Sequence, residues 1–149
     1  MLTIAEFMAG LKQMMKLHDG KLKQIGAGYG LSLLEITVIA FLSNNPARNT
    51  AADIAEYRRL SKGNVSQAVE SLIQKGLLER SQDAKDRRKV HLFLLPAAEP
   101  IVGKIHRMRE EFARMIGKGI SAEEMEVYQQ VHRRMAENIN AVCERSEEW

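Results

Sequence analysis

The chain has 149 residues, of which 45% are hydrophobic and 28% are charged, and its formal net charge is +3. This length and balance are typical of one soluble globular domain with a substantial core, and no apolar run approaches the roughly 20 residues that span a bilayer. The first 24 residues mix charged and apolar side chains, which is not the pattern of a secretory signal peptide. The single cysteine, Cys143, excludes an internal disulfide and suits a reducing compartment, so we expect a cytoplasmic protein with no membrane partner.

Apolar residues at helical spacing predict a first helix over residues 3–24. Alternate glycines, from Gly26 to Gly30, are expected to break it. The sequence Ser32-Leu33-Leu34-Glu35 is a capping box, in which a hydroxyl and a carboxylate satisfy free backbone N–H groups. It opens a short apolar helix that stops at Asn44-Asn45-Pro46.

Two further helices are predicted close together, from Thr50 to Arg58 and from Ser61 to Lys75. Thr50 and Ser61 are good N-cap residues, and Gly76 is a good left-handed terminator for the second of these helices. The residues of that helix expected to face the core are Val65, Ala68, Leu72 and Ile73.

After Gly76 the pattern changes from helix to strand. Residues 77–80 and 90–94 are predicted to form two short strands around a polar tip, residues 83–89. Beyond Pro96 the helical period returns, with one helix whose apolar residues follow a 4-3-4-3 spacing and a last helix opened by a capping box at Ser121. The predicted fold class is therefore mainly α with a small β-hairpin wing.

Positive charge is concentrated between residues 58 and 89. This segment holds nine basic and four acidic residues, a balance of +5, so the rest of the chain is slightly acidic. Such a concentration on one helix and one hairpin tip is typical of a surface that binds a phosphate backbone.

The helices predicted over residues 50–58 and 61–75 form a candidate helix-turn-helix. In that motif the N-terminal residues of the second helix reach base edges in the major groove. Gly63 allows close approach of the backbone, and the amides of Asn64 and Gln67 can pair with adenine. The alternative is a polar helix face that is merely solvated. The candidate major-groove residues are Lys62, Gly63, Asn64, Ser66 and Gln67.

The charged hairpin tip favours DNA binding over that alternative. It has no apolar residue to bury except Ala84, so it projects into solvent, where an arginine can enter the minor groove. Because side chains alternate along a strand, Arg87 and Arg88 cannot both point the same way. An acidic residue such as Asp86 suits this tip if it pairs with a neighbouring arginine. A tip that serves only solubility is the alternative here.

The segment from Leu31 to Val102 resembles the MarR family of winged helix-turn-helix transcription regulators. The resemblance is carried by the run L-S-K-G-N-V-S-Q-A-V-E-S-L-I-Q-K-G-L-L-E-R and by the wing signature D-x-x-D-R-R-K-V-x-L, followed by L-x-P-A. It implies a winged helix-turn-helix domain over residues 31–95. It also implies a helical dimerisation region over residues 1–30 and 96–149, made of the first and the last two helices of an obligate homodimer.

The resemblance further implies which residues contact double-stranded DNA. Arg88 would enter the minor groove, and Asp86 would hold an arginine in place. Arg58-Arg59 stands where an apolar residue and glycine are usual in the family, which puts extra charge at the turn for phosphate contacts. Gln67 stands where arginine is most common, which changes the base preference. The expected DNA-binding residues are Arg58, Arg59, Ser61, Lys62, Gly63, Asn64, Ser66, Gln67, Lys85, Asp86, Arg87 and Arg88.

We therefore expect a repressor that binds a pseudo-palindromic operator and is released by an effector. The effector is expected to be a small apolar or phenolic molecule, bound where the dimerisation helices meet the winged domain. The candidate lining residues are Met15, His18, Ile39 and Met108.

Two other functions remain open: a winged-helix module that binds a protein, and a regulator gated by zinc or an oxidant. The four histidines, His18, His91, His106 and His132, lack the spacing of a metal site. Cys143 lies near the C-terminus, whereas peroxide-sensing relatives carry a reactive cysteine near the N-terminus. No phosphate loop or nucleophile elbow is present, so we expect no metal, no cofactor and no enzyme activity.

Overall fold

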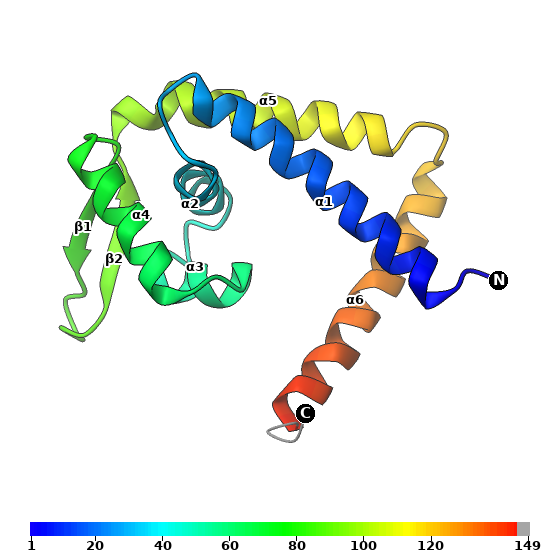
Figure 1. Cartoon of the computed structure of the whole chain (residues 1–149). Coiled ribbons are helices and arrows are strands. Elements are labelled where there is room, and N and C mark those ends of the chain that lie inside the picture. Colours follow the sequence, from blue (N-terminus) through cyan, green and yellow to red (C-terminus); the bar gives the residue numbers. More distant parts are fainter. Residues whose placement is uncertain (146–149) are drawn as a thin grey trace. The chain divides into compact units, whose positions relative to one another are not determined.

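The computed structural model describes residues 1–145 (Figure 1). It confirms the mainly helical fold with one hairpin. Of the described residues, 1–110 and 111–145 form two compact units, and α5 begins in the first and ends in the second. Residues 146–149, which belong to the expected dimerisation region, lie outside the described residues. The elements are α1 (Ile4–Ala27), α2 (Leu33–Asn44), α3 (Ala51–Arg58), α4 (Lys62–Gln74), β1 (Leu78–Gln82), β2 (Val90–Leu94), a 3-10 turn (Pro96–Ala98), α5 (Glu99–Ile116) and α6 (Ala122–Arg145).

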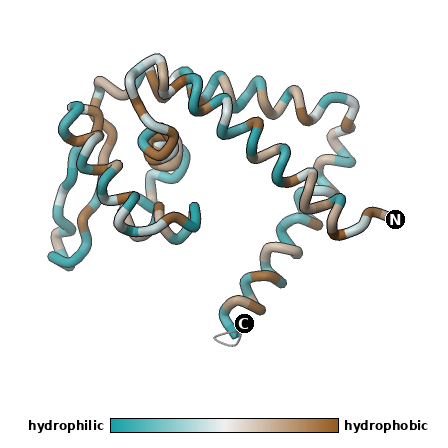
Figure 2. The backbone as a smooth tube through the Cα atoms, viewed as in Figure 1, coloured by the Kyte–Doolittle hydropathy of each residue, from teal (hydrophilic) through white to brown (hydrophobic). Residues whose placement is uncertain are grey.

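α2 is the central helix of the first unit because it is apolar on all sides. Every residue from Glu35 to Leu42 is buried, and the helix contacts α1, α4 and β2. Figure 1 shows α2 end-on, with α1 on one side and α3 and α4 on the others, and Figure 2 shows it largely brown. The side chains of Ile36, Val38 and Ile39 are fully buried, and each stabilises the fold by roughly 1.5–3 kcal/mol relative to an exposed position.

Side-chain caps start the helices where the sequence predicts them. The Ser32 hydroxyl accepts the N–H of Glu35 at 3.1 Å, and the Glu35 carboxylate accepts the N–H of Ser32 at 3.2 Å. Reciprocal boxes of the same kind start α3 and α6. These contacts join residues three positions apart, which is why the sequence alone locates them.

The prediction that Gly26 breaks the first helix is wrong. α1 continues to Ala27, and Gly26 is buried within it. A Cβ atom at this position would lie 3.0 Å from the carbonyl oxygen of Leu31 and 3.3 Å from the Cβ of Ile36. The glycine therefore allows α1 and the start of α2 to approach closely. Gly76, in contrast, has a φ of +72° just after α4 and confirms the predicted terminator.

A buried carboxylate joins the start of α2 to the end of α4. The Glu35 carboxylate accepts from the Lys75 ammonium at 2.7 Å and from the Ser71 hydroxyl at 3.0 Å. Lys75 also donates to the carbonyl of Gly30 at 3.1 Å. Burial by itself would raise the pKa of Glu35, but the hydrogen bonds from Lys75, from the Ser32 N–H and from Ser71 outweigh it, so the pKa is lowered.

Lys75→Met is expected to lower the free energy of unfolding at pH 7 by about 1–3 kcal/mol, because it leaves the buried Glu35 carboxylate without its cation. Because the pKa of Glu35 is lowered in the folded state, the pair stabilises the fold at pH values above 4.5, the ordinary pKa of a glutamate. This contribution is lost as the pH falls through the folded-state pKa. Urea unfolding at several pH values should therefore show that the difference in free energy of unfolding between Lys75→Met and the wild type becomes smaller below pH 4.5. Lys23→Met, at an exposed position of α1, is the control.

The second unit, described up to residue 145, contains the end of α5 and all of α6. In the single chain, none of the residues of α6 is buried. The helix nevertheless carries a set of large apolar side chains that are exposed to solvent. They are Val127, Tyr128, Val131, Met135, Ile139 and Val142.

Candidate nucleic-acid interface

α3 and α4 form the predicted helix-turn-helix. The Ser61 hydroxyl caps α4 by accepting the N–H of Asn64 at 3.2 Å. The turn before it is tight, since Arg59 has a φ of +50°, in the left-handed region. The five candidate major-groove residues, Lys62, Gly63, Asn64, Ser66 and Gln67, are all exposed on the first two turns of α4.

The opposite face of α4 packs on the core. Val65, Ala68 and Leu72 are buried as predicted. Ile73 is only half-buried, and Val69, one helical turn earlier, is buried in addition. A helix turns 100° per residue, so positions 65, 68, 69 and 72 share one face and position 73 lies at its edge. This packing leaves the polar face of α4 free of any role in the core.

An ion pair fixes α4 to the hairpin. Glu70, the only acidic residue in the sequence of α4, pairs with Arg80 on β1, and both side chains are about half exposed. The arginine compensates a negative charge that would otherwise stand on the helix proposed to face DNA. No local sequence pattern indicates this pair, because the two residues are on different elements.

The hairpin positions the charged tip as a wing. β1 and β2 are antiparallel, with Leu78 opposite Leu94 and Gln82 opposite Val90. Leu78 and Leu92 are buried, so the apolar end of the hairpin is anchored in the core. The tip, residues 83–89, is mostly teal in Figure 2, and the three basic side chains between residues 85 and 88 are exposed. They are Lys85, Arg87 and Arg88.

Asp86 contacts Arg88, and not Arg87, within the tip. Its carboxylate accepts the Arg88 N–H at 3.0 Å and lies 3.4 Å from the Arg88 Nε. The Arg88 side chain is 92% exposed, so the carboxylate biases its direction without covering it.

The base of the wing contains a hydrogen-bonded group that sequence reasoning missed. His91 Nε2 lies 2.7 Å from the Asp83 carboxylate, and His91 Nδ1 lies 2.6 Å from the side-chain oxygen of Asn49. The pKa of Asp83 is held well below its usual range. The main cause is the hydrogen bond with His91, followed by the hydrogen bonds from the N–H groups of Asp86 and Lys85. Asn49 is 42 residues from His91, so no local pattern could have indicated their contact.

Arg58 and Arg59 have different surroundings. Arg59 is exposed at the turn between α3 and α4. The Arg58 guanidinium instead lies 4.0 Å from the Asp19 carboxylate on α1. Arg58 also lines a cavity of about 220 Å³ that is bounded by α1, α2, α3 and α5.

That cavity combines aromatic and cationic side chains. Phe41 and Tyr57 have ring centroids 5.5 Å apart. Arg109, from α5, donates to the carbonyl of Ala40 at 2.8 Å. Burial, and secondly the charge of Arg58, lowers the pKa of Arg109 below its usual value. The lining residues are His18, Leu22, Thr37, Ala40, Phe41, Asn44, Asn45, Tyr57, Arg58 and Arg109.

The structure does not bring the four predicted effector residues together at this cavity. His18 lines it, whereas Ile39 and Met108 are buried core residues and Met15 is exposed on α1. Periodicity identified Ile39 and Met108 as inward-facing but could not show that other side chains cover them completely. Of the four residues, His18 alone lines this cavity, and the location of an effector site stays a prediction.

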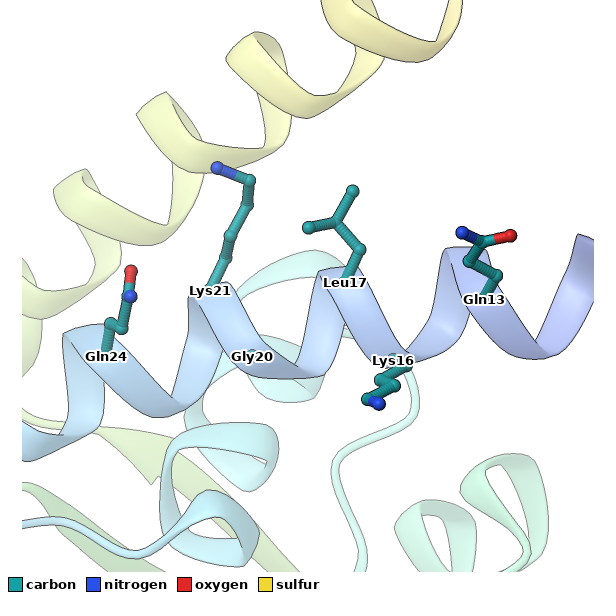
Figure 3. Close-up of a pocket in the computed structure, with 6 residues that line it drawn as sticks. All are labelled: Gln13, Lys16, Leu17, Gly20, Lys21 and Gln24. Carbon is teal, nitrogen blue, oxygen red and sulfur yellow. The ribbon is translucent and has the colours of Figure 1, made fainter.

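A second hollow, of about 470 Å³, runs along α1 (Figure 3). Its lining residues all come from that one helix, and the figure shows Lys16 pointing away from the side that carries Lys21 and Leu17. A hollow lined by one helix is an open groove and cannot surround a ligand. The lining residues are Gln13, Lys16, Leu17, Gly20, Lys21 and Gln24.

Within residues 1–145, no group of three His, Cys, Asp or Glu side chains lies close enough to hold a metal ion. Cys143 is exposed. Over the same residues, every helix is too short or too polar to cross a lipid bilayer.

The helix-turn-helix followed by a basic hairpin has the architecture of a winged helix domain. Comparison with protein families agrees, because residues 29–89 match the model of the MarR family. This segment of the chain is therefore similar to the MarR family, as the sequence motifs suggest.

Solved structures of this family share the fold at low sequence identity. A regulator from Silicibacter pomeroyi has a TM-score of 0.76 and 19% identity over 93% of each chain. A regulator from Listeria monocytogenes, solved with a 26mer DNA, has a TM-score of 0.77 and 15% identity over 89% of this chain and 87% of that one. BpsR of Bordetella bronchiseptica, whose DNA binding is regulated by 6-hydroxynicotinic acid, has a TM-score of 0.64 and 21% identity over 88% of this chain and 98% of that one.

Proposed function

We propose that this protein is a repressor that binds a pseudo-palindromic operator as a homodimer and is released from it by a small-molecule effector. It acts in the cytoplasm, by binding and not by catalysis. The observation that carries the proposal is the exposure, in one MarR-type domain, of a polar recognition helix and an arginine-bearing wing.

α4 reads the major groove in this proposal. Its exposed amides, on Asn64 and Gln67, match the donor and acceptor pair that adenine presents there. Lys62 and Ser66 contribute contacts to bases or phosphates, and the absence of a side chain at Gly63 lets the backbone approach the DNA. The regulator from Listeria monocytogenes, solved with a 26mer DNA, supports this use of the fold.

Basic residues outside α4 supply affinity that does not depend on base sequence. Lys85 and Arg87 contact phosphates beside the wing, and Arg88 enters the minor groove. Arg59 and Ser61 contact phosphates at the turn before α4, whereas Arg58 is nearer to α1 and contributes through its charge alone. Each phosphate contact releases counterions, so the affinity should fall steeply with salt.

The exposed apolar side chains of α6 support the homodimer. A helix with no buried residue gains little from packing in its own chain, and its apolar side chains are stabilised when a partner covers them. α1, in the first unit, likewise exposes Ile4, Met8 and Met15. A two-fold dimer would place its recognition helices roughly 34–36 Å apart, in successive major grooves.

The proposal is tested by fluorescence-anisotropy titration with the DNA upstream of the protein's own gene and with a shuffled duplex, at two salt concentrations. Binding that prefers the upstream DNA and weakens with salt supports it. If neither this DNA nor a selection from random oligonucleotides yields a preferred site, the proposal fails. The winged-helix module that binds a protein then becomes the better interpretation.

The 220 Å³ cavity indicates what kind of effector would bind. Arg58 and Arg109 both line it, and their like charges repel one another, so an anion between them would be stabilised. Phe41 and Tyr57 also line it and give it an aromatic character that suits an aromatic group. The cavity is smaller than the roughly 300–1,000 Å³ of drug-sized ligands, which suits a single ring. We propose a phenolic or aromatic carboxylate, in keeping with the 6-hydroxynicotinic acid that regulates BpsR.

Arg109→Met is expected to abolish the response to such an effector while leaving operator affinity within about threefold of wild type, because the side chain lies in the cavity and not on the recognition helix or the wing. The assay titrates single-ring hydroxy acids, beginning with 6-hydroxynicotinic acid, against the protein–operator complex. The methyl ester of each acid is the matched neutral control. An ester that releases the operator as well as its acid does would contradict the role of the two arginines.

A further inference from the structure

The direction of the wing depends on contacts at its base. A two-stranded hairpin is only marginally stable by itself in water. Between the wing and the start of α3 lies a hollow of about 550 Å³, lined by Arg88 and Lys89 on one side and by Ala51 and Ala52 on the other. The tip is thus held away from α3, and what fixes its direction must act at the base.

Asn49, in the segment between α2 and α3, contacts that base twice. Its backbone carbonyl accepts the N–H of Leu92 at 2.8 Å. Its side-chain oxygen lies 2.6 Å from Nδ1 of His91. β2 is therefore attached to this segment by one backbone bond and one side-chain bond at adjacent residues.

From His91 a continuous series of hydrogen bonds runs to the exposed arginine of the tip. His91 Nε2 lies 2.7 Å from the Asp83 carboxylate, whose other oxygen accepts the N–H of Asp86 at 2.9 Å. The Asp86 carboxylate in turn accepts the N–H of Arg88 at 3.0 Å and lies 3.4 Å from its Nε. Asn49, before α3, is thereby connected to the Arg88 guanidinium through three intervening side chains.

Histidine suits the middle of this series because its two ring nitrogens point in different directions and each can take part in a hydrogen bond. The His91 and Asp83 side chains are 28% and 27% exposed, which places the pair out of bulk water without isolating it. The other charged groups around this hollow are Asp53 on α3 and Arg88 and Lys89 on the wing.

We propose that His91 is a positioning residue for DNA binding, which ties the wing tip through Asp83 to Asn49 and so presents Arg88 to the minor groove. The proposal rests on the proposed function, in which Arg88 contacts DNA. It adds that this contact requires a residue that does not itself touch DNA.

A double-mutant cycle tests the proposal. Operator affinity is measured for the wild type, Arg88→Ala, His91→Phe and the double variant, all with the operator used above. Phenylalanine keeps a flat ring of similar size and removes both nitrogens. Arg88→Ala is expected to weaken binding by roughly 10- to 100-fold in the wild-type background and by less than about threefold in the His91→Phe background, because the arginine is then no longer presented.

Asn49→Ala removes the side-chain hydrogen bond to His91 at the other end of the series. It should reduce the effect of Arg88→Ala on operator affinity in the same way. His106→Phe, at an exposed histidine on α5, is the matched control and should leave that effect unchanged. Circular dichroism and thermal unfolding establish that each variant retains the helical fold. A wing-specific role leaves the helices intact, so unfolding of both His91→Phe and Asn49→Ala would overturn the proposal.

The outcomes separate this proposal from the function on which it rests. If the wild type has no preferred DNA, or if Arg88→Ala binds the operator normally, the proposed use of the wing fails. If Arg88→Ala weakens binding by the same factor with and without His91, the function stands and the positioning role is overturned.

Discussion

Ile139→Glu on α6 is expected to convert the protein to a monomer and to weaken operator binding by roughly 10²- to 10⁴-fold. The Ile139 side chain is 55% exposed in the single chain and belongs to the apolar set that includes Val131, Met135 and Val142. If a second copy covers this surface, the substitution buries a charge without a partner, which is strongly unfavourable. The affinity for the operator then falls because a monomer binds a single half-site, whereas the two linked domains of a dimer bind both half-sites at once.

Analytical ultracentrifugation and operator titration measure the two effects separately. Asn140→Glu introduces the same charge about 160–180° around the helix from Val131 and Val142, and should leave both the mass and the affinity near those of the wild type. A dimer that survives Ile139→Glu would show that the exposed apolar side chains of α6 do not form the interface.

Arg88→Ala is expected to weaken operator binding by roughly 10- to 100-fold and to reduce the slope of log affinity against log salt concentration by about one. The side chain is 92% exposed, and the carboxylate of Asp86 biases its direction, so its removal takes away a prepared contact and disturbs no packing. The free energy of unfolding should accordingly change by less than about 0.5 kcal/mol.

Arg114→Ala, at another exposed arginine, is the matched control for the change in net charge. An equal loss of affinity in both variants would mean that Arg88 contributes only to the overall charge of the protein. Titrations with a shuffled duplex add a second criterion, because a minor-groove contact should matter more for the operator than for the shuffled DNA.

The features that the sequence predicted correctly are those determined by neighbouring residues. The capping box at Ser32, the caps at Thr50 and Ser61 and the Gly76 terminator each depend on residues within a few positions, and all are present in the structure. Gly26 was misread because a helix-breaking tendency is local, whereas the close approach of Ile36 that requires a glycine is not.

The candidate effector site was the least predictable part. Apolar periodicity marks a side chain as inward-facing but does not show whether a cavity or another side chain lies next to it. Ile39 and Met108 therefore looked suitable and are core residues, while Arg109, a charged residue on the α5 helix, lines the cavity and was not considered. The wing base was missed for a related reason, since His91 and Asn49 meet only through the folding of distant segments.

The separation of the two faces of α4 has a consequence for how operator preference can change during evolution. Lys62, Asn64, Ser66 and Gln67 are exposed, while a different set, Val65, Ala68, Val69 and Leu72, packs the helix on the core. In the proposed function, mutations at the first set therefore alter the DNA sequence that is read without a loss of stability that would have to be compensated elsewhere. A duplicated copy of such a gene could acquire a new operator in a few steps, which makes this scaffold a good starting point for regulators of altered specificity.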